Sequence, residues 1–458
     1  MRNALVVAAF GLIALAVFAL RPTYVAGPAM RDFEAYWSAG ATLNAHADPY
    51  GRAIWNAERT VPGVDARHEE LLPFVGPPPT LAVWSALARL PWAAASRLWG
   101  TTIVLASFGL ILAALRGAGA TLTFSEFLTG LALAIGFGPA TSDLALGQVA
   151  VVAFFGAAFA ATAMPAGAKG LGAFLASLQP NVSLGLISQL GRNRTTVALA
   201  AGVLAAYLAG VWTAGWQWPA SYLALLLQHQ IAERFSAIQM TPGAIAHGLG
   251  APDVVAVLVS ASWVLTAIAA AGLLCARVRE PFARFAACSA LVPFVSTFFH
   301  EHDLIVAFPA VVFCAVRARG AARGIALFAT LLVAVDWAGL AQRPTGIAQS
   351  ACLAVAAALA FVAFGWDAEG LRALAVPVLC GAALFAAAAF VAVQHPMPVW
   401  PTHLDAFTPL PGDSAAAVWS EEQTASGLLA VVPVWAALRA LPLLGCACLA
   451  ALPGVRRD

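Results

Sequence analysis

A polar and aromatic run directly after the first apolar stretch contains the first side chains suited to chemistry. The run is Arg31-Asp32-Phe33-Glu34-Ala35-Tyr36-Trp37. If it is helical, Asp32 and Tyr36 share one face, and Arg31 and Glu34 share another. A carboxylate here is suited to accept a proton from a substrate hydroxyl at the membrane surface. The spacing equally allows a solvated ion pair between Arg31 and Asp32 at a helix start.

A second group of ionisable side chains lies late in the chain, where another apolar stretch ends. Its members are His300, Glu301, His302 and Asp303. Such groups are costly in lipid unless they face water or one another. Imidazolium groups at this place could stabilise a leaving phosphate, and a polar cap on two helix ends is the alternative. A metal site is disfavoured, because two helical positions i and i+2 diverge by about 200°.

Two further groups of polar residues are weaker candidates. Asp143, close to Gln148, could line a cavity, although an acid in a short turn is more often solvated. His229, Glu233 and Arg234 could bind substrate, but a charge cluster in a loop is usually a solvated face.

The composition excludes several classes of protein. Of 458 residues, 61% are hydrophobic and 10% are charged, with a mean hydropathy of +0.84, which excludes a soluble globular protein. The 24 Lys and Arg against 22 Asp and Glu include no long basic block, which excludes a nucleic-acid-binding or disordered chain. The seven cysteines lie in or beside apolar runs without metal-ligand spacing, so we expect no disulfide framework and no zinc site.

Apolar stretches of spanning or near-spanning length predict an all-α polytopic membrane protein with about 12 crossings in a single domain, residues 1–458. The stretches are 3–20, 98–115, 124–140, 144–162, 196–211, 254–276, 285–299, 304–316, 325–340, 347–364, 373–393 and 428–452. We interpret the first as a retained anchor, because no clear small-x-small cleavage site follows it.

Basic clusters between these stretches predict the orientation. They are Arg192 and Arg194; Arg277, Arg279 and Arg284; Arg317, Arg319 and Arg323; and Arg456 and Arg457. The positive-inside rule places them, and both termini, in the cytoplasm. Residues 21–76, 213–253 and 394–426 then form outer loops, of which the first has the acidic and aromatic mix of helices lying flat at the interface.

Two segments do not fit a simple crossing. Residues 78–90 are too short to span and predict an interfacial or re-entrant helix. Residues 170–190 are broken at Gln179-Pro180 and predict a helical hairpin. A helix broken at membrane depth is stable where protein or a wet cavity satisfies the freed backbone groups, so we expect a cavity wall there.

Six short motifs follow one another along the first 320 residues of the chain. They are Asp32-Phe33-x-x-Tyr36-Trp37, Asp48-Pro49-Tyr50, Phe74-Val75-Gly76-Pro77-Pro78-Pro79, Leu146-Gly147-Gln148, Arg192-Asn193-Arg194 and Phe299-His300-Glu301-His302-Asp303-Leu304. In this order, over residues 1–320, the chain resembles glycosyltransferase family 87. These are integral-membrane enzymes of the GT-C superfamily, typified by bacterial α-mannosyltransferases that use polyprenol-phosphate mannose.

The resemblance implies roles for the candidate residues. Asp32 would be the general base, and Tyr36 and Trp37 would belong to the acceptor surface. The cavity would contain Gln148, and the cluster from His300 to Asp303 would lie near the donor phosphate. The residues expected to contact substrate or line the cavity are Arg31, Glu34, Tyr36, Trp37, Gln148, Gln179, Glu301 and Asp303, with His300 and His302 at the phosphate.

Two positions depart from the family pattern. Gly76-Pro77-Pro78 stands where the family usually has Tyr-Pro-Pro, and Gln179-Pro180 stands where it has Lys-Pro. Without that Lys, a cation that could pair with a phosphate is missing, which leaves the identity or binding mode of the lipid donor open.

These observations predict an enzyme of the bacterial plasma membrane. An outward-facing site cannot use cytoplasmic nucleotide sugars, so we expect a polyprenyl-phosphate hexose donor, with mannose implied by the resemblance, and a glycan or glycolipid acceptor. A single base opposite the leaving phosphate implies inversion, by analogy with one-step glycosidases. We expect no cofactor, no metal and no nucleic-acid partner. The alternatives are a transporter or lipid flippase, for which a broken helix and intramembrane acids would mark a substrate path, and a non-catalytic scaffold.

Overall fold

Helices form all the regular secondary structure in the part of the chain that the structure describes, which confirms the predicted all-α class. The computed structural model describes residues 1–20, 30–64, 72–162, 165–191, 193–365, 370–399 and 412–454. The predictions that fall on Arg192, Arg456, Arg457 and parts of the first and third outer loops lie outside these residues.

The first half of the chain contains the elements α1 (Arg2–Ala14), η1 (Leu15–Ala19), α2 (Arg31–Asn44), η2 (Arg52–Ile54), α3 (Trp55–Glu58), α4 (Pro78–Leu87), α5 (Trp92–Gly117), α6 (Phe124–Ile135), α7 (Gly138–Leu146), α8 (Ala150–Ala161), α9 (Ala166–Ala176), η3 (Leu184–Gln189), α10 (Asn193–Ala214) and α11 (Trp218–Glu233). The second half contains α12 (Pro242–Gly248), α13 (Asp253–Arg277), α14 (Pro281–Ala290), α15 (Val292–Val295), η4 (His302–Ala307), α16 (Phe308–Arg317), α17 (Gly320–Ala334), α18 (Trp337–Gln342), η5 (Pro344–Gly346), α19 (Ile347–Ala363), α20 (Gly370–Gln394), α21 (Ala415–Ala425), α22 (Pro433–Ala451) and η6 (Leu452–Gly454).

Each predicted apolar stretch contains helix, but not each is one straight span. In the described residues, seven helices are long and apolar enough to cross a membrane, or eight if the pair α6 and α7, bent by 71°, is one span. The other predicted spans are short or interrupted helices: α8, α14 with α15, η4 with α16, and α17 with α18. The chain is therefore a multi-pass membrane protein, with fewer straight crossings than hydropathy alone predicts.

Local sequence signals explain where the helices nearest the site begin and end. Pro78 occupies the first position of α4, where a missing N–H is tolerated. Thr123 and Glu126 form a capping box at the start of α6. At the end of α7, Gly147 adopts the left-handed conformation with φ of 77°, which favours glycine. This turn fixes the position of the next residue, Gln148.

The structure agrees with the prediction for one of the two segments that did not fit a simple crossing, and agrees in part for the other. The segment 78–90 contains the ten-residue helix α4, too short to span. The segment 170–190 is a helical hairpin only in part, because α9 is followed by turns and by the 3-10 helix η3. Pro180 interrupts the helix, and Gly185 lies so close to α14 that an added Cβ would be 2.2 Å from the Oγ of Ser289. The second arm therefore packs as a tight turn against α14.

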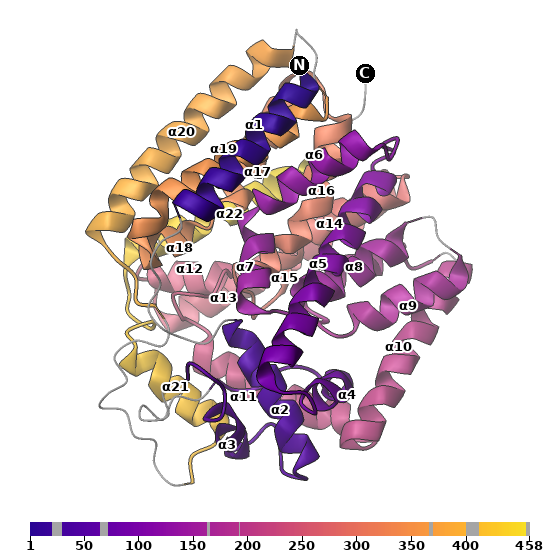
Figure 1. Ribbon diagram of the computed structural model, residues 1–458, viewed down its shortest axis with the longest axis vertical. Helices are drawn as coiled ribbons and strands as arrows, with labels where there is room; N and C mark the ends of the chain where they lie inside the picture. Colours follow the sequence, from indigo (N-terminus) through magenta and orange to yellow (C-terminus); the bar gives the residue numbers. More distant parts are fainter. Residues whose placement is uncertain are drawn as a thin grey trace.

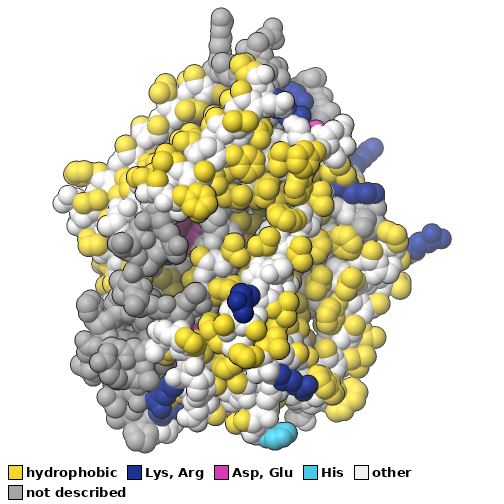
Figure 2. All heavy atoms as spheres, in the orientation of Figure 1, with side chains coloured by type: hydrophobic (Ala, Val, Ile, Leu, Met, Phe, Trp, Pro, Cys, Tyr) yellow, Lys and Arg dark blue, Asp and Glu magenta, His cyan; other side chains and the backbone are white. Residues whose placement is uncertain are grey.

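Short helices gather at the end of the molecule opposite the N-terminus. Figure 1 shows α2, α3, α4, α11 and α21 together there, although they come from three distant parts of the sequence. The face in Figure 2 is mostly covered by hydrophobic side chains, with Lys and Arg mostly toward its margins. This distribution is that of a surface in contact with lipid.

Stacked aromatic rings hold α2 against α4 and α5. Tyr36 stacks on Trp84 at a centroid distance of 4.9 Å, and Phe33 stacks on Trp99 at 6.1 Å. Gly40 lets the backbones of α2 and α4 approach, since a Cβ there would be 2.1 Å from the carbonyl oxygen of Trp84. The first turn of α2, which carries Asp32, is thus fixed by rigid packing.

Candidate active site

Asp32 lies in the first turn of α2 and is held by the side chain of Gln148. The Gln148 amide donates a hydrogen bond to Oδ2 of Asp32 and accepts one from the hydroxyl of Tyr36 at 2.5 Å. Asp32 and Tyr36 share one face of α2, as their spacing predicts. The bonds fix the orientation of both side chains. Burial raises the pKa of Asp32 above its usual 3.8, against the opposing effects of the Gln148 hydrogen bond and Arg31. A raised pKa makes this carboxylate a stronger base.

The segment from His300 to Asp303 folds into a turn that Asp303 organises. Oδ2 of Asp303 accepts a hydrogen bond from the backbone N–H of His300 at 3.0 Å, and Oδ1 accepts one from the amide of Gln179 at 2.7 Å. Nε2 of His302 lies 3.7 Å from the same Oδ1. Gln179, at the broken hairpin, therefore contacts the acid of the turn.

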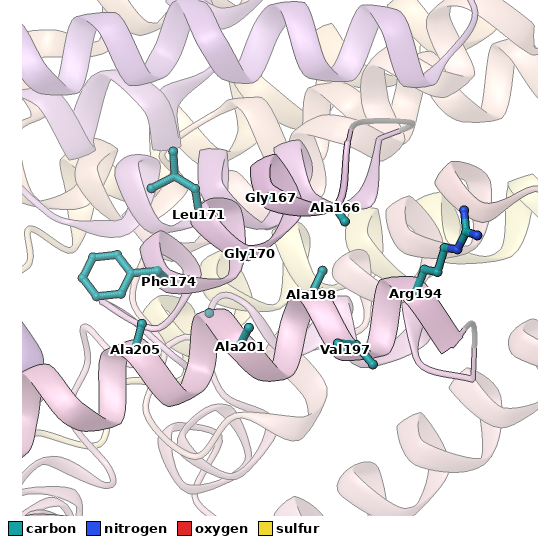
Figure 3. Close-up of a pocket in the computed structure, with 11 residues that line it drawn as sticks. Ala166, Gly167, Gly170, Leu171, Phe174, Arg194, Val197, Ala198, Ala201 and Ala205 are labelled. Atoms are coloured by element: carbon teal, nitrogen blue, oxygen red, sulfur yellow. The ribbon is translucent and has the colours of Figure 1, made fainter.

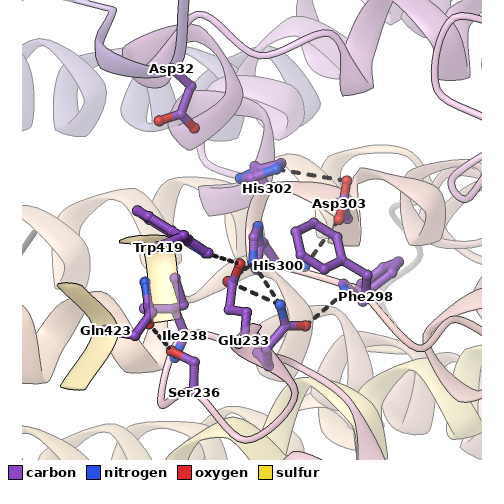
Figure 4. A network of polar contacts seen from close by, with 12 residues as sticks. Asp32, Glu233, Ser236, Ile238, Phe298, His300, His302, Asp303, Trp419 and Gln423 are labelled. Carbon is purple, nitrogen blue, oxygen red and sulfur yellow. Dashed lines mark hydrogen bonds and ion pairs between the residues drawn. The ribbon is translucent and has the colours of Figure 1, made fainter. Parts of the chain in front are cut away.

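His300 is paired with a carboxylate from another part of the chain. Oε1 of Glu233, at the end of α11, lies 2.7 Å from Nε2 of His300 (Figure 4). The amide of Gln239 donates to the same Oε1 at 3.0 Å, and the indole of Trp419 on α21 donates to Oε2 at 3.0 Å. Glu233 is fully buried, and its two oxygens are both bonded.

Charges around the two histidines make them different. Burial by itself lowers the pKa of His300, but Glu233, Asp303 and Asp32 together raise it above its ordinary value. Burial and the neighbouring His300 hold the pKa of His302 well below the usual range. Of the two histidines, His300 is therefore the one that more readily carries a proton.

Asp32 faces this histidine turn, although the two are far apart in the sequence. Figure 4 shows the Asp32 carboxylate pointing toward the side of the turn where His302 lies. The charges of His300 and Glu233 both influence the pKa of Asp32, which places them within electrostatic range of each other. The structure thus brings a carboxylate, two imidazoles and hydrogen-bonded amides together in one place.

Other predicted site residues lie outside this network. Trp37 packs edge-on against Trp92 at 5.9 Å and donates to the carbonyl of Leu90 at 3.3 Å, so it joins α2 to the start of α5. Glu34 is fully buried within α2 packing. Glu301 lies beside α7, where the Cβ position of Gly138 is 3.5 Å from its Oε1.

Arg31 and Asp143 stand beside the network. Arg31 is the first residue of α2, and its charge lowers the pKa of Asp32. It takes no part in the hydrogen bonds that Gln148 makes with Asp32 and Tyr36. Asp143 is fully buried, not solvated as an acid in a short turn usually is, and its Oδ1 accepts from the backbone of Val151 at 3.1 Å.

Several residues of the network have weak signals or none in the sequence. Glu233 was one of three charged candidates in a loop, whereas Gln239, Trp419 and Gln423 had no distinguishing pattern. Only the packing of α21 on α11 brings them together, with Ser236 donating to Gln423 at 2.7 Å. Neither clustered charges nor residue spacing in the sequence could have predicted that an indole bonds a carboxylate from a distant helix.

The described residues also contain an apolar cavity apart from this network. It lies between α9 and α10, with a volume of about 700 Å³ (Figure 3). Ala and Gly dominate its lining, and Arg194 lies at its edge. In the described part of the chain, no group of three or more His, Cys, Asp or Glu is placed to hold a metal ion.

Comparison with known proteins identifies the central part of the chain. Residues 74–299 match the sequence model of glycosyltransferase family 87. The match contains Gln148, Gln179 and Glu233, and ends directly before His300, whereas Asp32 lies upstream of it. No curated protein and no solved structure matches the chain.

Proposed function

Since this chain belongs to glycosyltransferase family 87, we propose that it transfers a hexose, with mannose the first candidate, from a polyprenyl-phosphate donor to a glycan or glycolipid acceptor. The reaction takes place at the outer face of a bacterial plasma membrane, with both chain termini in the cytoplasm. The membrane location follows from the apolar helices, and the transfer of a sugar follows from the family.

The observation that carries the proposal is the arrangement of Asp32 opposite the pair of His300 and Glu233. A carboxylate with a raised pKa suits the removal of a proton from a hydroxyl. An imidazolium in a buried site suits the negative charge that develops on a leaving phosphate. Each group is held by bonds to other side chains, so little reorganisation is needed when charge develops.

The proposed step is a single displacement. The acceptor hydroxyl gives its proton to Asp32, and its oxygen forms a bond with the anomeric carbon. The bond between that carbon and the phosphate oxygen breaks, and its electron pair stays on polyprenyl phosphate, beside His300. Attack opposite the leaving group inverts the anomeric configuration. In place of the family Lys, Gln179 supports this site through Asp303, which contributes to the charge of His300.

Replacement of Asp32 tests the proposal. Asp32→Asn keeps the size of the side chain but removes the base, so we expect transfer to fall about 10²–10⁴-fold. The measurement is release of free polyprenyl phosphate from polyprenyl-phosphate mannose by purified protein with acceptor present. A flippase would move the lipid without releasing the phosphate, so the same assay separates transfer from transport.

The matched control is Asp253→Asn. Asp253 is an exposed carboxylate in the first turn of α13, paired with His247 at 3.3 Å. This variant should retain wild-type transfer. Wild-type rates from correctly folded Asp32→Asn protein would remove Asp32 from the mechanism.

A further inference from the structure

His229 is a buried imidazole that has no hydrogen-bond partner within the described residues. It lies on α11 and is 2% exposed. Neither its Nδ1 nor its Nε2 is bonded. A buried polar group without a partner is costly, and native proteins keep few of them. Two such atoms in one ring indicate a partner that binds from outside the protein.

The position of His229 on α11 directs it to the candidate active site. Tyr222, His229 and Glu233 are spaced so that they share one helix face. At one end of this face, the Tyr222 hydroxyl donates to the carbonyl of Val75 at 2.9 Å. At the other end, Glu233 pairs with His300 at 2.7 Å. His229 thus lies on the same face of α11 as Glu233 and one turn before it, next to the pair of Glu233 and His300.

The protonation state of His229 indicates which chemical groups it can bind. Burial lowers its pKa to about 4. At neutral pH the ring therefore presents one N–H donor and one acceptor nitrogen. A phosphodiester only accepts hydrogen bonds, whereas a sugar hydroxyl both donates and accepts. A neutral imidazole therefore matches a pyranose hydroxyl better than it matches the phosphate.

We propose that His229 binds a hydroxyl of a sugar at this site and makes the enzyme selective for sugars that carry it. The inference rests on the proposed function and deepens it, because it names a residue that recognises the carbohydrate. The hydroxyl belongs to the donor hexose or to the acceptor glycan, and the experiment below distinguishes the two sources.

The first measurement is thermal unfolding of the protein without ligand. His229→Leu removes two unbonded polar atoms from a buried place, so we expect its unfolding temperature to equal or exceed that of the wild type. The control is His46→Asn, at an exposed left-handed residue that asparagine tolerates. A fall of several degrees in His229→Leu alone would show a structural role and overturn the proposal.

The second measurement is the affinity for three probes, obtained from their shifts of the unfolding temperature. The probes are polyprenyl-phosphate mannose, polyprenyl phosphate alone and methyl α-mannoside. We expect His229→Leu to bind one mannosyl probe about tenfold to a hundredfold more weakly, and to bind polyprenyl phosphate as the wild type does. His229→Gln, which keeps a donor and an acceptor, should restore part of the loss.

The outcomes separate the inference from the proposed function. A loss confined to polyprenyl-phosphate mannose assigns His229 to the donor, and a loss confined to methyl α-mannoside assigns it to the acceptor. The inference is overturned if the wild type and His229→Leu have equal affinities for both mannosyl probes. It is also overturned if the wild type binds neither the mannosyl probes nor their glucosyl and galactosyl analogues. A wild type that binds mannosyl probes through His229 without transferring the sugar refutes the proposed catalysis and leaves the inference standing.

Discussion

At the scale of residues, the candidate site contains three ionisable groups whose pKa values are shifted by their surroundings: Asp32, His300 and Asp303. Burial raises the pKa of Asp32, and it raises the pKa of Asp303 to about 6 against the opposing effects of His300 and Gln179. Glu233 is the main neighbour that raises the pKa of His300 in spite of its burial. The pKa of each group thus differs from that of the isolated side chain, which is common at catalytic sites.

These shifts predict a bell-shaped pH dependence of kcat/KM. Asp32 and Asp303 must be ionised, so the rate should rise as the pH increases through about 6, where Asp303 loses its proton. His300 must be protonated, so the rate should fall at a pH above the ordinary histidine value, because its pKa is raised. The measurement is kcat/KM for polyprenyl-phosphate mannose between pH 5 and pH 9, a range of about four units chosen to contain both limbs.

His300→Gln tests the assignment of the alkaline limb. It should lower kcat/KM by about 10²–10³-fold, because a charged donor to the leaving group is lost. The remaining activity should no longer fall in the alkaline range. An alkaline limb that persists in this variant would assign the titration to another group.

At the scale of elements, short connections position the side chains of the candidate site. Gly147 ends α7 in the left-handed conformation, and an added Cβ would lie 2.8 Å from Cβ of Phe33. The indole of Trp99 also donates to the carbonyl of Gly147 at 2.7 Å. The turn therefore fixes Gln148 against α2, and through Gln148 it fixes Asp32.

Gly147→Ala should reduce both stability and transfer. The left-handed backbone costs about 1–3 kcal/mol for a residue other than glycine, and the clash with Phe33 displaces Gln148 from Asp32. Unfolding temperature and kcat are the measurements. Gly250→Ala is the control, because Gly250 has φ of 97° but nothing within 4 Å of an added Cβ. It should lose stability without losing kcat; equal loss of kcat in both variants would contradict the argument.

The helix α21 contributes to the site from beyond the region that matches the family. Its Trp419 bonds Glu233, and Arg439 of α22 donates to the carbonyls of Ser236 and Gln239 at 2.9 Å each. Together they hold the end of α11 and the loop after it. Trp419 and Arg439 are thus positioning residues for the Glu233 and His300 pair.

Trp419→Phe tests this positioning role. It keeps an aromatic ring but removes the N–H that bonds Glu233, so we expect kcat to fall about tenfold and the alkaline limb to move. A structural role alone would lower stability without moving the pH profile. The control is Trp435→Phe, which removes a comparable indole bond to the carbonyl of His395 at 2.9 Å and leaves the Trp435 carbonyl, which accepts from Arg439, in place. A shift of the alkaline limb in both variants would refute a specific role of Trp419.

At the scale of the whole molecule, the proposed orientation places the site at the outer face. Arg279 and Arg319 lie in the connections α13–α14 and α16–α17. These connections meet near the end of α5 that is away from α2, where Arg317 donates to the carbonyl of Ala118 and lies 3.9 Å from Glu280. A polyprenyl-phosphate donor needs this arrangement, because its headgroup stays at the membrane surface while its chain remains in lipid.

Labelling of single cysteines in intact cells tests this orientation. In a background without the seven native cysteines, His46→Cys should react with a membrane-impermeant maleimide. Arg319→Cys, between α16 and α17, should react only after the cells are permeabilised. The reverse pattern would place the site in the cytoplasm, where nucleotide sugars are available, and would refute the lipid-phosphate donor.

The sequence by itself determined the solvent of this protein and the type of its elements. Long apolar runs interrupted by arginine require helices in lipid, because each backbone group must be bonded within its own segment. Motifs such as Asp32-Phe33-x-x-Tyr36-Trp37 also pointed to the family, which the match over residues 74–299 confirms. The breaks were less predictable: α6 and α7 are bent by 71°, and at this bend Gly136 packs closely against the backbone of α19, a contact that only the fold supplies.

Only the tertiary structure decided which polar side chains meet. Asp32, Gln148, Glu233, His300 and Trp419 come from separate segments, and no spacing within the chain encodes their contacts. The opposite pKa shifts of His300 and His302 depend chiefly on one carboxylate, Glu233, at the end of a distant helix. Sequence fixes what each segment can bury, whereas the charge of a buried group depends on its neighbours in space, which packing alone supplies.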